Sequence, residues 1–256
     1  MLYAGFMSFS TVIHDVWSIG LVLQVLLAVV LISRGVWRKF PVFAAYTLFS
    51  LLETAVLYGV FHRPLLYLYL YVIGESILFL LGLALVYEIF VHLFTAQPAL
   101  RKMASLVFRV VVVLLVLLAG GVLYFKAPLI APHGSGGISA LLIVEEAARL
   151  LQVGLIMFLF LFSSAFGLHW RQHVFGVALG LGISSVVELV AVTMALHSGP
   201  TLMKALNLAH VASFDLSILI WLGYLALPER VASSAEVPQR AQLEQWNQAV
   251  MELINR

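Results

Sequence analysis

The sequence contains no cysteine, and this absence excludes several kinds of chemistry. Disulfides, thiolate catalysis, cysteine-bound zinc and iron–sulfur clusters all require cysteine sulfur. Charged residues are scarce as well: they make up 10% of the 256 residues, against about 25% in an average soluble domain. The net charge of +2 is too small for a protein that binds nucleic acid, so we expect no nucleic-acid partner.

Apolar side chains are abundant instead, at 63% of the chain with a mean hydropathy of +1.08. A water-soluble globule of this size cannot bury so much apolar surface. Crossing a bilayer takes roughly 20 helical residues, and the segments that are long enough are 13–33, 41–61, 65–93, 104–125, 139–167, 173–197 and 201–227. None shows the period-two alternation of membrane barrel strands. The sequence therefore predicts an all-α, seven-helix transmembrane bundle in the lipid bilayer.

The basic residues between these segments predict the orientation of the bundle. With the N-terminus outside, the inner loops and the start of the tail hold Arg34, Arg38, Lys39, Arg101, Lys102, Arg171 and Arg230. The outer side then holds only Arg63, Lys126 and Lys204. Because inner loops are enriched in Lys and Arg, this distribution favours an N-out, C-in topology.

Two parts of the chain differ in character. Residues 1–228 form the predicted transmembrane domain, and residues 229–256 form a predicted cytoplasmic linker and amphipathic tail helix. In the tail, Leu243, Trp246, Val250 and Leu253 recur at helical spacing and would form an apolar stripe. Such a helix could lie on the inner membrane surface or dock a cytoplasmic partner.

Polar side chains recur inside the predicted spans, where ionisable groups are costly and usually face the bundle interior. At helical spacing they form stripes that converge on the outer half of the bundle. The candidate ligand-binding residues are Glu53, Tyr71, Glu75, Glu146, Arg149, Glu188, His210 and Asp215. A structural alternative pairs Glu145 with Arg149 one turn away, the other acids being protonated links between helices.

Individual residues carry further expectations. Arginine stays charged in proteins, so Arg149 must find carboxylates and could hold two at once. Glu88 and Arg109 could form an ion pair near the inner face. The spacing of Gly176 and Gly180 predicts close helix packing. The fourth segment, 104–125, has almost no polar residue and should be the most lipid-exposed.

The chain also resembles a family of small seven-helix bacterial membrane proteins with no assigned function. The resemblance covers most of residues 30–195. It rests on the sequence Trp37–Pro41 with Phe43 and Tyr46, on Tyr87–Phe90, on Arg149 with Gln152, and on Leu168–Gly176. It implies a bacterial inner-membrane location and assigns no activity or site residue.

Three functions fit this pattern. The first is a protein that binds a small molecule or cation and signals inward, and this is the one we favour. The second is a cation- or proton-coupled transporter, although no inverted repeat is evident. The third is an intramembrane metal-dependent enzyme, for which histidine is scarce near the carboxylates.

Overall fold

The computed structural model describes residues 2–60, 62–94, 98–126, 136–165, 170, 172–195 and 200–227. These residues contain helices and no strand, which confirms the all-α fold. The helices are α1 (Leu2–Ser33), α2 (Val36–Lys39), α3 (Pro41–Val60), α4 (Pro64–Leu93), α5 (Pro98–Lys126), α6 (Gly136–Ala165), α7 (Gln172–Ala195) and α8 (Pro200–Ala226). The predicted linker and tail helix, residues 229–256, lie outside the described residues.

The long helices coincide with the seven predicted segments. Six of them, α3 to α8, are long and apolar enough to cross a membrane. In α1 the apolar stretch found among the described side chains is shorter, Ser18–Ser33. The structure therefore has the helices of a multi-pass membrane protein.

Proline and glycine mark the ends of several helices. Proline is the first residue of α3, α4, α5 and α8, where its missing N–H costs no hydrogen bond. Gly35 has a φ of 64° and donates its N–H to Ile32 O at 3.1 Å, which ends α1. The short helix α2 follows directly. The hydrophobic pattern did not predict α2, because a single turn carries no periodic signal.

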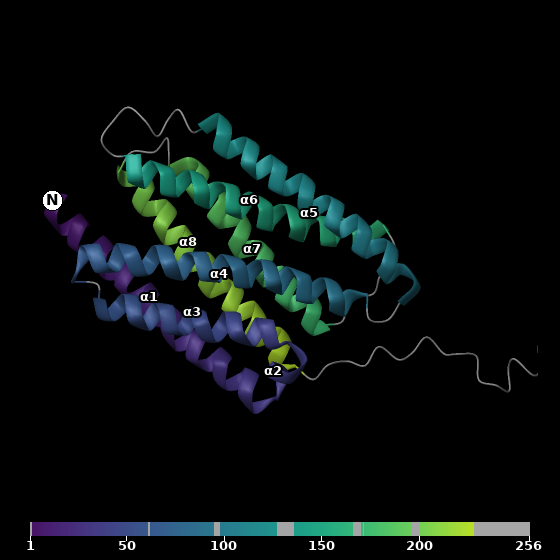
Figure 1. The fold of residues 1–256 in the computed structure, drawn as a ribbon. Helices are drawn as coiled ribbons and strands as arrows, with labels where there is room; N and C mark the ends of the chain where they lie inside the picture. The colour runs from purple at the N-terminus through teal and green to yellow at the C-terminus, as the bar shows by residue number, and fades with distance from the viewer. Residues whose placement is uncertain are drawn as a thin grey trace, which may run out of the picture.

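Figure 1 shows α5 at one edge of the bundle, packed along α6. Only 6% of its apolar stretch is buried, compared with 28% to 50% in the other five spans. This helix is therefore the least buried of the six spans, as expected of the most lipid-exposed segment. Helix α8 packs against α1 and α7, while α4 packs against α3, α6 and α7, so these six helices surround the interior.

One half of the bundle is filled with aromatic and aliphatic side chains. Phe90 lies 4.8 Å from Phe94 and 4.7 Å from Phe108 between ring centroids, and Phe94 lies 5.6 Å from Phe162. Phe94 is completely buried. This half contains the start of α3 and the end of α4.

Glu88 lies in the same half. The sequence suggested an ion pair between Glu88 and Arg109, but among the described residues this pair does not form. The Glu88 carboxylate instead accepts hydrogen bonds from the N–H groups of Val42 and Phe43, both at 3.0 Å. Arg109 is exposed on α5. The first turn of a helix has N–H groups without partners in the helix, and a buried carboxylate satisfies them well. Glu88 therefore caps α3.

Glycines allow α7 and α8 to approach closely. A Cβ atom on Gly176 would collide with Tyr224, and one on Gly180 would collide with Trp221. The Trp221 side chain uses this space and donates its indole N–H to Val177 O at 3.2 Å. The predicted close packing at Gly176 and Gly180 is therefore confirmed.

Candidate functional site

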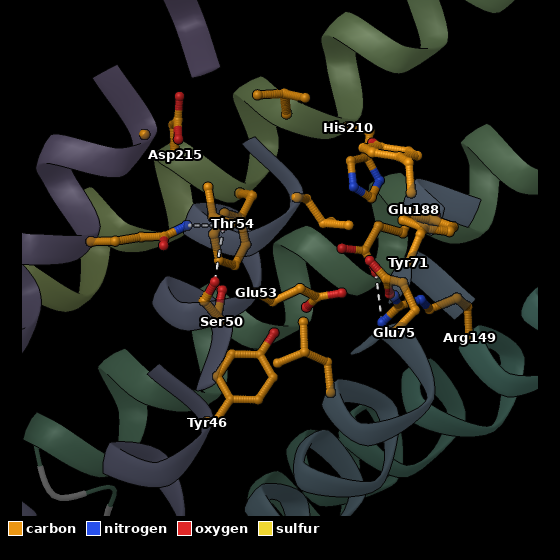
Figure 2. A pocket seen from close by; sticks show the side chains of 17 residues that line it. Tyr46, Ser50, Glu53, Thr54, Tyr71, Glu75, Arg149, Glu188, His210 and Asp215 are labelled. Carbon is orange, nitrogen blue, oxygen red and sulfur yellow. Dashed lines mark hydrogen bonds and ion pairs between the residues drawn. The ribbon is translucent and has the colours of Figure 1, made fainter. Parts of the chain in front are cut away.

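The opposite half of the bundle encloses a cavity of about 290 Å³. At about 30 Å³ for each water molecule, this is space for roughly ten waters. The cavity lies toward the end of α3 and the start of α4, and α1, α6, α7 and α8 complete its wall (Figure 2). Helix α5 contributes no lining residue.

Seven of the eight predicted site residues line this one cavity: Glu53, Tyr71, Glu75, Arg149, Glu188, His210 and Asp215. They come from α3, α4, α6, α7 and α8, so segments far apart in the sequence converge here. The side chains of three further polar residues of α1 and α8, His14, Lys204 and Asn207, lie outside the described part of the chain.

Glu146 is the exception, because it is buried but is not a lining residue. Its Oε1 accepts a hydrogen bond from Thr193 Oγ1 of α7 at 3.3 Å. It lies one turn before Arg149, and its side chain contacts α7 rather than the cavity. Glu146 is therefore not among the residues that line the cavity, and sequence spacing does not show which neighbouring helix a side chain contacts.

Arg149 links three helices through two carboxylates. Its Nη2 lies 2.8 Å from Glu75 Oε2 of α4, and its Nη1 lies 2.8 Å from Glu188 Oε2 of α7. The Glu75 contact is also a hydrogen bond, whereas Glu188 Oε2 is an ion-pair partner without hydrogen-bond geometry. Nη1 donates a further hydrogen bond to Gln152 at 3.3 Å. The expectation that Arg149 holds two carboxylates is confirmed.

The alternative pairing within α6 is not the arrangement that forms. Among the described residues, the ion pairs of Arg149 are to Glu75 and Glu188, and Glu145 is not one of them. The Arg149 side chain is 8% exposed, so it lies inside the bundle where acids from α4 and α7 converge on it.

The opposite side of the cavity, which we call the amide side, consists of Gln24, Ser50, Thr54 and Asp215. Gln24 Nε2 donates to Thr54 Oγ1 at 3.4 Å, and Thr54 Oγ1 donates to Ser50 O at 2.9 Å. Gln24 is 4% exposed, yet its Oε1 has no hydrogen-bond partner. Gln24 was missed as a site residue, although a lone amide in the apolar run Leu21–Leu31 was a usable signal.

Two lining carboxylates are seated against glycines. Glu53 occupies the space beside Gly74 of α4, and Asp215 occupies the space beside Gly20 of α1. A Cβ atom at either glycine would collide with the carboxylate. Among the described residues, neither acid has an ion-pair partner, and Glu53 Oε1 is buried without a hydrogen bond.

Aromatic rings complete the wall. Tyr46, Tyr67, Tyr71 and Phe214 line the cavity, and the Tyr67 and Tyr71 rings stack with centroids 6.3 Å apart. Trp221 is 1% exposed and packs edge-on against both Tyr46 and Phe214, at centroid distances of 6.2 and 6.4 Å. Trp221 therefore supports two lining residues from the core side.

The site is thus a polar cavity with one guanidinium, four carboxylates and an aromatic wall. Within the described residues, no group of three or more His, Asp or Glu side chains is placed to hold a metal ion. Comparison with protein-family models, with curated proteins and with solved structures finds no match to this chain.

Proposed function

We propose that this chain is a seven-helix, N-out, C-in protein of the bacterial inner membrane that binds a small ligand in the cavity and senses it. The observation that carries the proposal is the convergence of charged side chains from five helices on one cavity. Ionisable groups are costly inside a membrane and are typically functional when they line a shared space. Polar links between helices would use their polar atoms on one another, whereas Glu53 Oε1 and Gln24 Oε1 in the cavity wall have no hydrogen-bond partner among the described residues.

The packed core next to the cavity favours a binding function over transport of a solute across the membrane. Trp221 is almost completely buried beneath Tyr46 and Phe214, and the core beyond it is filled with apolar side chains. A solute in the cavity therefore meets packed side chains on the side toward the start of α3. In the proposed topology this is the cytoplasmic side, so packed side chains close the cavity toward the cytoplasm.

A sensor without a catalytic domain needs a partner to pass the signal on. In this proposal the tail helix in residues 229–256 is the element that reaches a cytoplasmic protein. In the sequence, this tail follows the end of α8. Arg34 Nη1 donates to Leu225 O at 3.3 Å, which ties the end of α1 to the end of α8.

Native mass spectrometry of the protein extracted from its own membrane tests the binding function. We expect a bound small molecule that is lost in Ser50→Phe, because Ser50 lines the cavity and is 5% exposed. Ser76→Phe is the matched control, since Ser76 is exposed on α4. A wild-type protein with no bound molecule and an empty cavity in an experimental map would contradict the proposal.

A further inference from the structure

Resting on the proposed function, we infer that the ligand is a small organic cation whose ammonium group binds on the amide side of the cavity. Asp215 and Gln24 would accept its hydrogen bonds there, while its carbon chain would lie along the aromatic wall toward Glu53. Figure 2 shows the space involved, with Asp215, Ser50 and Thr54 on one side, Arg149 and Glu75 on the other, and Glu53 between them.

The charges that line the cavity are unbalanced. Glu53, Glu75, Glu188 and Asp215 are four acids, against the single permanent cation Arg149. Arg149 is already shared between Glu75 and Glu188 at 2.8 Å each. Glu53 and Asp215 are therefore left without a cation among the described residues. A positively charged ligand would supply the missing charge. An anionic ligand would meet Arg149, which already forms ion pairs with Glu75 and Glu188.

The unused hydrogen-bonding atoms on the amide side are acceptors. Gln24 is 4% exposed with an unpartnered Oε1, and Asp215 is 8% exposed and forms no hydrogen bond or ion pair in the described part of the chain. A buried acceptor without a partner is unfavourable, because it has lost its hydrogen bonds to water and gained none in the protein. A ligand bearing N–H donors would satisfy these oxygens. An ammonium group only donates hydrogen bonds, so it matches the unpartnered acceptor oxygens on the amide side.

Size and wall composition favour an organic cation over a metal ion. A cavity of about 290 Å³ is far larger than one ion needs, and among the described residues no His, Asp or Glu group is arranged for metal. Tyr46, Tyr67, Tyr71 and Phe214 present ring faces or edges to the space. Aromatic rings attract cationic groups and also cover the carbon chain of an amine.

Thermal unfolding of the purified protein in detergent at constant ionic strength tests this inference with three probes of equal chain length. Butane-1,4-diamine, butane-1,4-diol and succinate differ mainly in end-group charge. We expect the diamine to raise the unfolding temperature in a dose-dependent way. We expect Asp215→Asn to require at least about tenfold more diamine for the same shift, equal to about 1.4 kcal/mol of binding.

Glu146→Gln is the matched control. Glu146 is 8% exposed, as Asp215 is, but it does not line the cavity. It should keep the wild-type response to the diamine. If Asp215→Asn does not yield folded protein, Gln24→Leu replaces it, because this change removes the unpartnered oxygen and keeps a side chain of similar length. Gln24→Leu should weaken the diamine response in the same direction.

A stabilisation by the diol or succinate equal to that by the diamine would overturn the inference. So would a diamine response that is unchanged in Asp215→Asn and Gln24→Leu, or no diamine response at all. A response to the diol or succinate that Ser50→Phe abolishes would reject the cation while leaving the binding function intact. Failure of the binding function itself is seen separately, as a cavity that carries no molecule by native mass spectrometry.

Discussion

The carboxylate of Glu53 on α3 occupies the space that a Cβ atom on Gly74 of α4 would fill. The two helices therefore pack so that an acidic side chain of α3 lies directly against the backbone of α4. Gly74 holds this acid at the edge of the cavity without contributing any polar atom. Asp215 and Gly20 form the same arrangement between α8 and α1.

Gly74→Ala should therefore destabilise the protein by about 1–3 kcal/mol, because the new methyl group must displace Glu53 or separate the helices. Gly120→Ala is the control, since a Cβ atom there meets nothing within 4 Å. That control should be neutral or slightly stabilising, as alanine is favoured over glycine in helices. Unfolding in a detergent titration measures both, and equal stabilities would show that Glu53 moves aside without cost.

Arg149→Ala should cost about 3–5 kcal/mol, because it leaves Glu75 and Glu188 buried without their cation. Arg63→Ala should have little effect, because Arg63 is exposed in the turn between α3 and α4. Thermal unfolding in detergent compares the two variants. Arg149→Lys should be intermediate, since a single ammonium group lacks the forked geometry that reaches both acids. If Arg149→Ala were as stable as Arg63→Ala, Arg149 would not be the charge centre of the site.

Glu88→Ala should destabilise the first turn of α3, because the N–H groups of Val42 and Phe43 would lose their acceptor. We expect a loss of about 1–3 kcal/mol, the cost of leaving buried donors unpaired. Amide hydrogen exchange gives a local readout: these two amides should exchange faster, while amides in the middle of α5 should not change. Unchanged protection of Val42 and Phe43 would rule out the capping role.

The N-out topology predicts opposite labelling of two positions. Because the chain has no cysteine, a single introduced thiol can be labelled without background. Arg63→Cys should react with a membrane-impermeant maleimide on intact spheroplasts, and Arg38→Cys should react only after the membrane is opened. Both side chains are exposed in the structure, so burial does not account for a difference. The reverse pattern would place the cavity in the cytoplasmic half.

The sequence was sufficient to locate the helices because their signals are local. Hydrophobic runs, and prolines at the starts of α3, α4, α5 and α8, depend only on neighbouring residues. It also identified the charged lining residues, because an ionisable group in a membrane helix needs a polar neighbour. What it could not supply was the choice of neighbour, as Glu88 and Glu146 show. Glu88 is bound to backbone N–H groups of α3, and Glu146 to Thr193 of α7.

The spacing of residues along the chain reveals neither which backbone N–H groups a side chain binds nor how each helix is rotated relative to its neighbours. Any residue at positions 42 and 43 would present the same N–H groups to Glu88, so their side chains carry no signal of the contact. Gln24 is the reverse case. Its single amide in an apolar helix is a visible signal, and it became informative only when Thr54 and the cavity gave it a place.

The two hydrogen bonds from Glu88 also restrict how α3 can move. A helix anchored through the N–H groups of its first turn cannot slide along its axis without breaking both bonds, whereas a tilt about that end would keep them. Glu53 lies roughly 16 Å further along the axis, at about 1.5 Å per residue. A ligand that displaces Glu53 would therefore push on α3 far from the end that is fixed by Glu88, and would tilt the helix about that end. Such a tilt would displace the cavity end of α3 the most and its first turn the least.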